Sequence, residues 1–580
     1  LPSLGIAGYS GLGQFFGIEG PQYYLSWTGD AEKILGHHTI GFGGGYIRTA
    51  FSTGHTLDTE CFDASQTAIS TNANSGDGMA SFLLGLPYTA SRFAGPPTGY
   101  LLWHAFNGYL QDTDRVTSKL TLNLGLRWDY ISPPIIYPGL GTFDFINGTY
   151  VWDTTNPITK APANIGRGGY APDYDGWQPR LGFAYEFTPK TVFRSSFGLF
   201  DNIYGWNQQS PTGAAWGNWP YSFSQAEGAL NTGLPSAFMV DPFPGPPVAS
   251  TTPLGCSQCQ NLETSSTRTP YVEEWSASLQ RQFTQSLMGE VDYFGSHGVK
   301  LNSQVLDNVA VTPGITPFQT RQPWPAFPPF IDNGFDEYMS WYDGLAAKLQ
   351  KRYSRNLTFL VSYTWSKAVT QMDGGCDGDV FGEPCTNATR YDIYQFKGPA
   401  GFSLTNMLNA AYDYRMPWKT GNKIADAALA NWELSGIISA TSGVPYPVYL
   451  STDNENIGAA GRDSEFPNLV CNPNAGFTRS VTEWFNTACY QLPTFGTYGN
   501  AGKHDLYSDA LANWDFALAK RWPIGKENRD LEFRAEFFNL FNGTTFDPPN
   551  DVFGVPGFGE VSNTTRQGGR EIQFALKLHF

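Results

Sequence analysis

The chain has 580 residues, enough for several soluble domains, but only 15% of them are charged, against roughly 25% in an average soluble protein. Aromatic residues also make up 15%, and Gly (64) and Pro (40) are plentiful, which excludes both a disordered polymer and a protein of long helices. The formal net charge of −16 excludes nucleic acid as a partner, because nucleic-acid binding needs a basic face.

The remaining class is a large all-β protein with many turns. No run of about 18 apolar residues occurs, so the sequence has no signal for a transmembrane helix. A membrane barrel instead crosses the bilayer with short strands in which apolar and polar residues alternate. This pattern is recognisable only when many such strands follow one another along the chain. Residues 1–21 begin without Met or a charged leader. We therefore expect them to be the remnant of an extracellular loop in a longer protein.

Alternating strands follow along the chain. In Leu120–Tyr130, every second residue is apolar and the apolar face ends in Trp128 and Tyr130, residue types that favour a membrane interface. The same alternation recurs in 356–366, 531–537 and 571–580. One such strand would suit a soluble sandwich, but a long series with aromatic ends favours a barrel in lipid.

The connections alternate between short and long, as expected when one rim faces the periplasm and the other the exterior. Short turns are expected at 36–38, 118–119, 189–190, 284–286, 354–356 and 523–529. Long extracellular connections are expected near 53–99, 133–177, 203–269, 299–337, 371–401, 452–511 and 543–569. This alternation assigns Met79–Pro87 to a short helix or ordered loop, because a strand there would place two short turns in succession. The result is a transmembrane antiparallel β-barrel with about 15 strands in this chain.

Seven segments, taken in order, resemble the C-terminal barrel of the Oar-like TonB-dependent outer-membrane receptors, which carry a carboxypeptidase-regulatory-like domain at their N-terminus. They are Tyr109–Tyr130, Glu273–Phe283, Val291–Leu301, Leu349–Ala368, Asn431–Tyr446, Leu531–Asn542 and Gly569–Phe580. The resemblance runs from about residue 22 to the end, with one departure at Thr113-Asp114, where an Asp-Trp pair is typical.

The resemblance implies a barrel of about 22 strands around a plugged lumen, of which 22–580 would form the C-terminal portion. The plug, the TonB box and the first strands would then lie upstream of Leu1. It also implies a location in the outer membrane of a Gram-negative bacterium. The implied partners are outer-membrane lipid, the TonB complex through the upstream segment, the outer-membrane assembly machinery and a large extracellular ligand. The assembly machinery would read the last strand at Phe574, Leu576, Leu578 and Phe580.

Charged side chains on the polar faces of the strands are expected to point into the lumen, because Arg or Lys facing lipid at the midplane costs roughly 2–4 kcal/mol. The main candidates are Arg127, Asp129, Glu290, Asp292, Lys348 and Arg534. They would hold the plug electrostatically or line a substrate path. Aromatic loops offer a second candidate surface, with Trp206, Trp216, Trp219 and Trp324 either contacting ligand or packing on one another as a rigid lid.

Six cysteines fall in pairs within long loops, and an exported protein meets an oxidising compartment, so local disulfides are expected. The pairs are Cys256 with Cys259, Cys376 with Cys385 and Cys471 with Cys489. Cys61 is left over, either free or bonded to a cysteine upstream. His37 and His38 are adjacent at a short turn, which favours a solvated turn over a metal site.

No cofactor is expected, although acidic loops at Asp373–Asp379 and Asp453–Glu455 offer oxygen ligands that suit calcium. The motifs HExxH, GxSxG and GxxxxGK[ST] are absent, so an enzyme is not expected. The leading hypothesis is TonB-dependent uptake of a large ligand, such as an oligosaccharide, a peptide or a metal chelate. The alternatives are a surface-binding or adhesion protein anchored by the barrel, and a passive porin.

Overall fold

The computed structural model describes the parts of the chain that follow. These are residues 3–12, 23–54, 58–69, 75–94, 98–144, 148–169, 171–201, 219–221, 223–228, 238–240, 243, 269–327, 329–371, 389, 391–393, 395–459, 465–503, 505–525, 529–562 and 568–580. None of the helices in these ranges is both long and apolar enough to cross a membrane.

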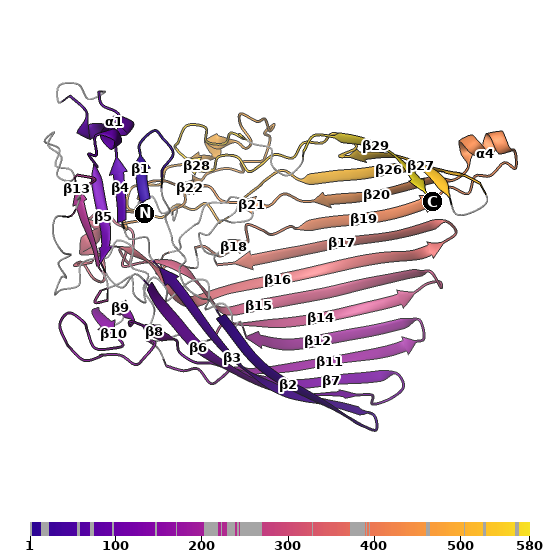
Figure 1. The fold of residues 1–580 in the computed structure, drawn as a ribbon, viewed down its shortest axis with the longest axis horizontal. Helices are drawn as coiled ribbons and strands as arrows, with labels where there is room; N and C mark the ends of the chain where they lie inside the picture. The colour runs from indigo at the N-terminus through magenta and orange to yellow at the C-terminus, as the bar shows by residue number, and fades with distance from the viewer. Residues whose placement is uncertain are drawn as a thin grey trace.

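A single curved sheet of 17 strands dominates the molecule, and its long strands run side by side (Figure 1). Its strands are β2 Tyr23–Leu35, β3 His38–Gly54, β6 Thr98–Asp114, β7 Leu120–Ile131, β8 Ile135–Tyr137, β11 Trp177–Thr188, β12 Thr191–Asp201, β14 Tyr271–Gln282, β15 Leu287–Asp307, β16 Phe330–Ser354, β17 Leu357–Thr370, β18 Gly398–Pro399, β19 Asn406–Arg415, β20 Trp432–Thr441, β26 Leu511–Pro523, β27 Asp530–Phe538 and β29 Glu571–His579. Apart from the short β8 and β18, fifteen strands of 9 to 25 residues form the sheet, as the alternation predicts.

Each long strand pairs antiparallel with the next long strand in the chain, from β2–β3 through to β27–β29. Among the described strands, β2 pairs on one side only, with β3, and β29 pairs only with β27. All-β architecture with a large antiparallel sheet is therefore confirmed.

The short connections lie at one rim of the sheet and the long ones at the other (Figure 1). Local backbone chemistry explains the turns. Gly36 is the first central residue of the two-residue turn between β2 and β3, and its φ is +63°. Gly is the preferred residue at this position when φ is positive. Arg355 and Asn356 have φ +50° and +63° between β16 and β17. Positive φ at both central residues is typical of a type I′ turn, whose twist matches that of the flanking strands.

One connection at the short-turn rim carries the helix α4 Lys423–Leu429, which the sequence pattern did not predict. Asn422 caps its N-terminus by accepting the N–H groups of Ile424 and Ala425. Its last carbonyls accept hydrogen bonds from the Trp432 and Trp522 indoles, at 2.9 and 2.8 Å, and from the Lys520 ammonium. The helix is therefore held against strands β20 and β26.

Two predicted strand ends differ from the structure. A long connection was predicted near 299–337, but β15 continues to Asp307 and β16 begins at Phe330. The pairing of β15 with β16 shifts register three times between Gly298 and Val305. Each shift breaks the two-residue period, so the sequence alternation ends before the strands do.

Additional short strands fold within the long connections and, in the case of β1, ahead of the first long strand. They are β1 Ser3–Ile6, β4 Asp58–Phe62, β5 Thr89–Ala94, β9 Gly141–Asp144, β10 Thr149–Trp152, β13 Phe223–Gly228, β21 Pro445–Tyr446, β22 Tyr449–Leu450, β23 Asn468–Leu469, β24 Tyr490–Gln491, β25 Leu506–Tyr507 and β28 Val552–Phe553. Strands β1, β4, β5 and β13 form a separate sheet beside the long-connection rim (Figure 1). The helix α1 Gly78–Leu83 confirms the assignment of Met79–Pro87 as helix or ordered loop. Three short 3-10 helices are η1 Ala64–Gln66, η2 Phe318–Thr320 and η3 Thr487–Cys489.

The main hydrophobic core lies in the long connections, where side chains from distant segments meet. We call the described residues of 391–400, 443–510 and 545–562 the loop unit. Its core contains Phe396, Phe466 and Phe485, each about 1% exposed, and it packs against Val305 of β15 and Tyr338 of β16. The sheet and the loop unit therefore share one core.

The Cys471–Cys489 disulfide joins two segments of the loop unit, with a Cα–Cα distance of 4.9 Å, and Cys489 is fully buried. Replacing both cysteines with Ser is expected to lower the free energy of unfolding of the loop unit by about 3 kcal/mol, because the bond closes a loop of 18 residues. Amide hydrogen exchange of peptides within 465–503 measures this loss. A double variant whose loop exchange equals that of the oxidised protein contradicts the prediction.

Candidate functional site

The sheet has one polar face and one apolar face. The register of the strand pairs shows which residues of each strand belong to which face. On β7 the polar face carries Arg127 and Asp129, and the apolar face carries Leu124, Leu126 and Trp128. Directly paired residues of neighbouring strands lie on the same face. The pairings Arg127↔Gln178, Glu290↔Lys348 and Ala517↔Glu536 belong to the polar face, whereas Leu181↔Leu124 belongs to the apolar face.

The register places the six predicted lumen charges together on this polar face, spread over four strands. They are Arg127 and Asp129 on β7, Glu290 and Asp292 on β15, Lys348 on β16 and Arg534 on β27. The apolar face includes many large side chains that are at least one third exposed, among them Leu124, Leu181, Phe183, Val291 and Trp365.

Asp129 is one of the buried charges of the polar face and is 7% exposed. Its carboxylate accepts hydrogen bonds from Arg127 Nε at 2.8 Å and from the Gln178 amide. Arg180 donates to Gln178 Oε1 at 3.2 Å and lies over the Phe200 ring, 4.5 Å from its centroid. Charged and amide side chains from β7 and β11, with the Phe200 ring of β12, thus form one connected network.

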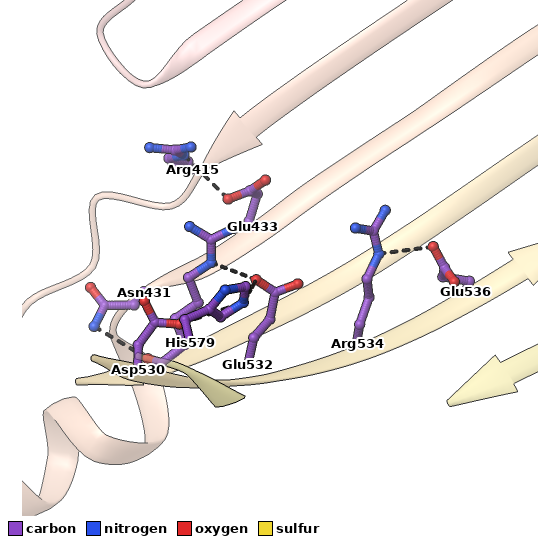
Figure 2. A network of polar contacts seen from close by, with 9 residues as sticks. Arg415, Asn431, Glu433, Asp530, Glu532, Arg534, Glu536 and His579 are labelled. Carbon is purple, nitrogen blue, oxygen red and sulfur yellow. Dashed lines mark hydrogen bonds and ion pairs between the residues drawn. The ribbon is translucent and has the colours of Figure 1, made fainter. Parts of the chain in front are cut away.

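A second network extends over β19, β20, β26, β27 and β29 (Figure 2). Arg521 Nε contacts Glu532 Oε2 at 2.8 Å, and His579 Nε2 lies 3.4 Å from the same oxygen. Arg415–Glu433 and Arg534–Glu536 are further ion pairs, at 3.2 and 2.8 Å. Of these residues, the sequence alternation places Glu532, Arg534 and Glu536 on one polar face. The partners of Glu532, on β26 and β29, follow only from the register of these strands.

Two hollows lie along the polar face. One, of about 670 Å³, is lined by Gln111, Asn123, Arg180, Ser196, Glu274 and Ser296, among others. The other, of about 700 Å³, includes Gln350, Asp413, Asp515 and Arg534, together with Leu360 and Ile437. Ile437 is 56% exposed, so the second hollow offers apolar as well as charged contacts.

The loop unit buries two carboxyl groups, of Glu455 and Glu465, which are 2% and 1% exposed. Glu465 Oε2 accepts the backbone N–H groups of Asn454 and Glu455 at 2.7 and 2.9 Å. Burial, together with a side-chain hydrogen bond with Asp453, raises the pKa of Glu465 to about 9. Burial also raises the pKa of Glu455 to about 8, with Asp392 and Asp453 adding repulsion.

Asp453 and Glu455 belong to one of the two acidic loops that suit calcium. The Asp453 carboxylate accepts the backbone N–H groups of Ile457 and Gly458, both at 2.7 Å. Neither residue belongs to the clusters of three or more converging metal-ligand side chains in the described part of the chain. The other acidic loop, Asp373–Asp379, lies outside the described residues.

Trp219 is 8% exposed and packs edge-to-face on Tyr150 and Trp152, with ring centroids 5.7 and 5.6 Å apart. Trp324 packs at the border of the same cluster, 6.2 Å from the Phe143 ring. Both therefore pack within one aromatic cluster. Trp206 and Trp216 lie outside the described residues.

The remaining predicted site residues are placed as follows. Cys61 on β4 has a free, half-buried thiol, whereas Cys256, Cys259, Cys376 and Cys385 lie outside the described residues. On β29, Phe574, Leu576 and Leu578 share the apolar face and are more than half exposed, and Phe580 follows at 96%.

One protein family and several solved structures are similar to this chain. The family model described as "Outer membrane beta barrel domain" matches residues 1–573. Among solved structures, the outer membrane transporter YddB from Escherichia coli is similar at 10% identity and a TM-score of 0.48, over 96% of this chain and 53% of that one. The siderophore receptor PiuA from Acinetobacter baumannii is similar at 11% and 0.41, over 95% and 55%. The ferric yersiniabactin uptake receptor FyuA from Yersinia pestis is similar at 9% and 0.40, over 97% and 55%.

The chain spans about half the length of these solved proteins. No curated protein matches the sequence. The family match covers nearly the whole chain and agrees with the antiparallel sheet, whose faces are polar and apolar. Such domains reside in the outer membrane of Gram-negative bacteria and are not enzymes. The protein belongs to the outer-membrane β-barrel domain family.

Proposed function

We propose that this protein is an Oar-like TonB-dependent receptor that takes up a large ligand across the outer membrane. The ligand class is an oligosaccharide, a peptide or a metal chelate. The ordered series of seven segments from Tyr109 to Phe580 supports the receptor type, and membership of the outer-membrane barrel family is consistent with it. The TonB complex would act through a segment upstream of this chain, and the assembly machinery would read Phe574 to Phe580.

The polar face carries the proposal, because it is suited to the barrel interior. Its ion pairs, such as Arg127–Asp129 at 2.8 Å and Arg521–Glu532 at 2.8 Å, would be strongly unfavourable against lipid tails. The opposite face presents exposed Leu, Val, Phe and Trp side chains that suit lipid. With the polar face inward, the two hollows of about 670 and 700 Å³ open towards the lumen.

The loop unit would form the outer vestibule. Its core joins segments from three long connections and is fastened to β15 and β16, so it is suited to hold a docking surface in a fixed position. A preorganised surface binds a ligand without the free-energy cost of ordering mobile loops.

Uptake of the ligand is expected to require TonB. Cells that express the full-length protein would be offered fluorescent oligosaccharides, peptides and ferric chelates, with and without a functional TonB gene. We expect at least one probe to accumulate in the periplasm only when TonB is present, while binding to the cell surface is unchanged. Equal uptake in both strains contradicts the proposal and indicates a passive pore. Surface binding without uptake in either strain indicates an anchored binding protein.

A further inference from the structure

Two histidines and two aspartates converge at the short-turn rim, on the apolar face of the sheet. His37 Nδ1 lies 2.6 Å from Asp114 Oδ1, and His38 Nδ1 lies 2.7 Å from Asp112 Oδ2 and 3.8 Å from Asp114 Oδ1. The two imidazole rings are 4.2 Å apart at their centroids. We call these four residues the rim cluster.

The fold produces this convergence from segments more than 70 residues apart. The two-residue turn at Gly36 brings His37 and His38 to the start of β3. The register then pairs His38 with Asp114 and Ile40 with Asp112 on β6. His38, Asp112 and Asp114 therefore point to the same side of the sheet, and His37 reaches them from the turn.

Three of the four residues, His37, His38 and Asp114, offer ligand atoms that all lie within 4.8 Å of one another. Asp112 adjoins this group through its contact with His38. Zinc binds His nitrogen and carboxylate oxygen at about 2.0–2.2 Å, so tetrahedral ligand atoms lie about 3.3 Å from one another. The His37–Asp114 and His38–Asp112 pairs lie at hydrogen-bond distances of 2.6 and 2.7 Å, so a bound ion would replace these hydrogen bonds and move each pair apart by less than about 1 Å. Asp112 Oδ1 is buried and accepts no hydrogen bond, so this carboxylate retains an unused acceptor.

Charge also favours a cation here. With neutral imidazoles, the two aspartates give the rim cluster a charge of −2, which a divalent ion neutralises. A second group of possible ligands, Asp530, Glu532 and His579, is less suitable. Arg521 already contacts Glu532 at 2.8 Å, so a positive charge occupies that site (Figure 2).

We propose that His37, His38, Asp112 and Asp114 form a binding site for a divalent transition-metal ion, Zn²⁺ by preference. Imidazole nitrogen with carboxylate oxygen is a donor set that this class of ion favours. The ion fastens the β2–β3 turn to β6 at the rim. This site is independent of the ligand that the receptor transports.

Equilibrium dialysis of the full-length, detergent-purified protein against Zn²⁺ tests the proposal. Bound Co²⁺ supplies a second readout, because two imidazoles and two carboxylates in tetrahedral geometry give a characteristic visible absorption. We expect the unmodified protein to bind the ion at this site. The D112N/D114N variant should bind it at least ~100-fold more weakly, since loss of a supporting group alone costs 10–100-fold.

The matched control is H579Q, which removes the imidazole of the second cluster and should leave zinc and cobalt binding unchanged. If D112N/D114N fails to fold, H37Q provides the same test, because His37 lies in the turn and is 61% exposed. Unchanged metal affinity in a folded rim-cluster variant overturns the proposal. Loss of the cobalt spectrum in H579Q instead of the rim-cluster variant also overturns it.

Discussion

Raising the pH from about 5 to about 9 is expected to destabilise the loop unit, even though the barrel strands stay folded. The pKa values of Glu455 and Glu465 are about 8 and 9 in the folded protein, above the ordinary Glu value of 4.5, chiefly because both carboxyls are buried. Between the unfolded and folded values, the folded state binds more protons than the unfolded state. Stability is therefore fully present below about pH 4.5 and is lost as the pH rises through 8 and 9.

The slope is about 1.4 kcal/mol per pH unit for each carboxyl that is protonated only in the folded state. Amide hydrogen exchange of peptides within 443–459 and 465–503, measured as a function of pH and corrected for intrinsic exchange, follows the loss. E465Q should flatten the dependence, because the amide stays neutral and its oxygen still accepts the N–H groups of Asn454 and Glu455. E560Q, which changes an exposed carboxyl of the loop unit, should leave the dependence intact. If the free energy of opening of the loop unit does not change with pH in the unmodified protein, the prediction is wrong.

Replacing Arg521 with Ala is expected to lower the free energy of unfolding by about 3 kcal/mol, because Glu532 would remain buried without its guanidinium partner. The Glu532 side chain is 4% exposed, and the Arg521–Glu532 distance is 2.8 Å. Urea unfolding of the purified protein in lipid vesicles measures the change.

Arg534 provides the matched control, since its Nε also lies 2.8 Å from a carboxylate oxygen, of Glu536, on the same strand as Glu532. The Glu536 side chain is 23% exposed, so water compensates for a lost partner and R534A should cost about 1 kcal/mol or less. Equal losses in R521A and R534A would show that burial of Glu532 does not determine the effect.

Much of the sheet is predictable from the sequence, because a strand between two different environments must alternate at every residue. The pattern of Leu120–Tyr130 appears as β7, and the alternation of short and long connections yields the fifteen long strands. The same reasoning places six charges on one face. It fails where β15 and β16 shift register, because there the period itself changes.

The functional details depend on contacts between distant segments, which periodicity does not encode. Glu465 is an ordinary acidic residue in the sequence, and only the packing of Phe466 against Phe396 makes its surroundings dry. His37 and His38 read as a solvated turn, since Asp112 and Asp114 follow more than 70 residues later. A prediction of either site would have required the register of β3 with β6, or the fold of the loop unit.

The length of β16 sets how far the loop unit stands from the bilayer. At about 3.4 Å per residue, its 25 residues span about 80 Å, which a tilt of about 45° reduces to a height of about 60 Å. The lipid-facing band of such a protein is only about 25 Å tall. More than half of the strand would therefore rise above the hydrocarbon. In the proposed receptor, ligand capture would then take place tens of ångströms into the extracellular space, beyond the lipid headgroups.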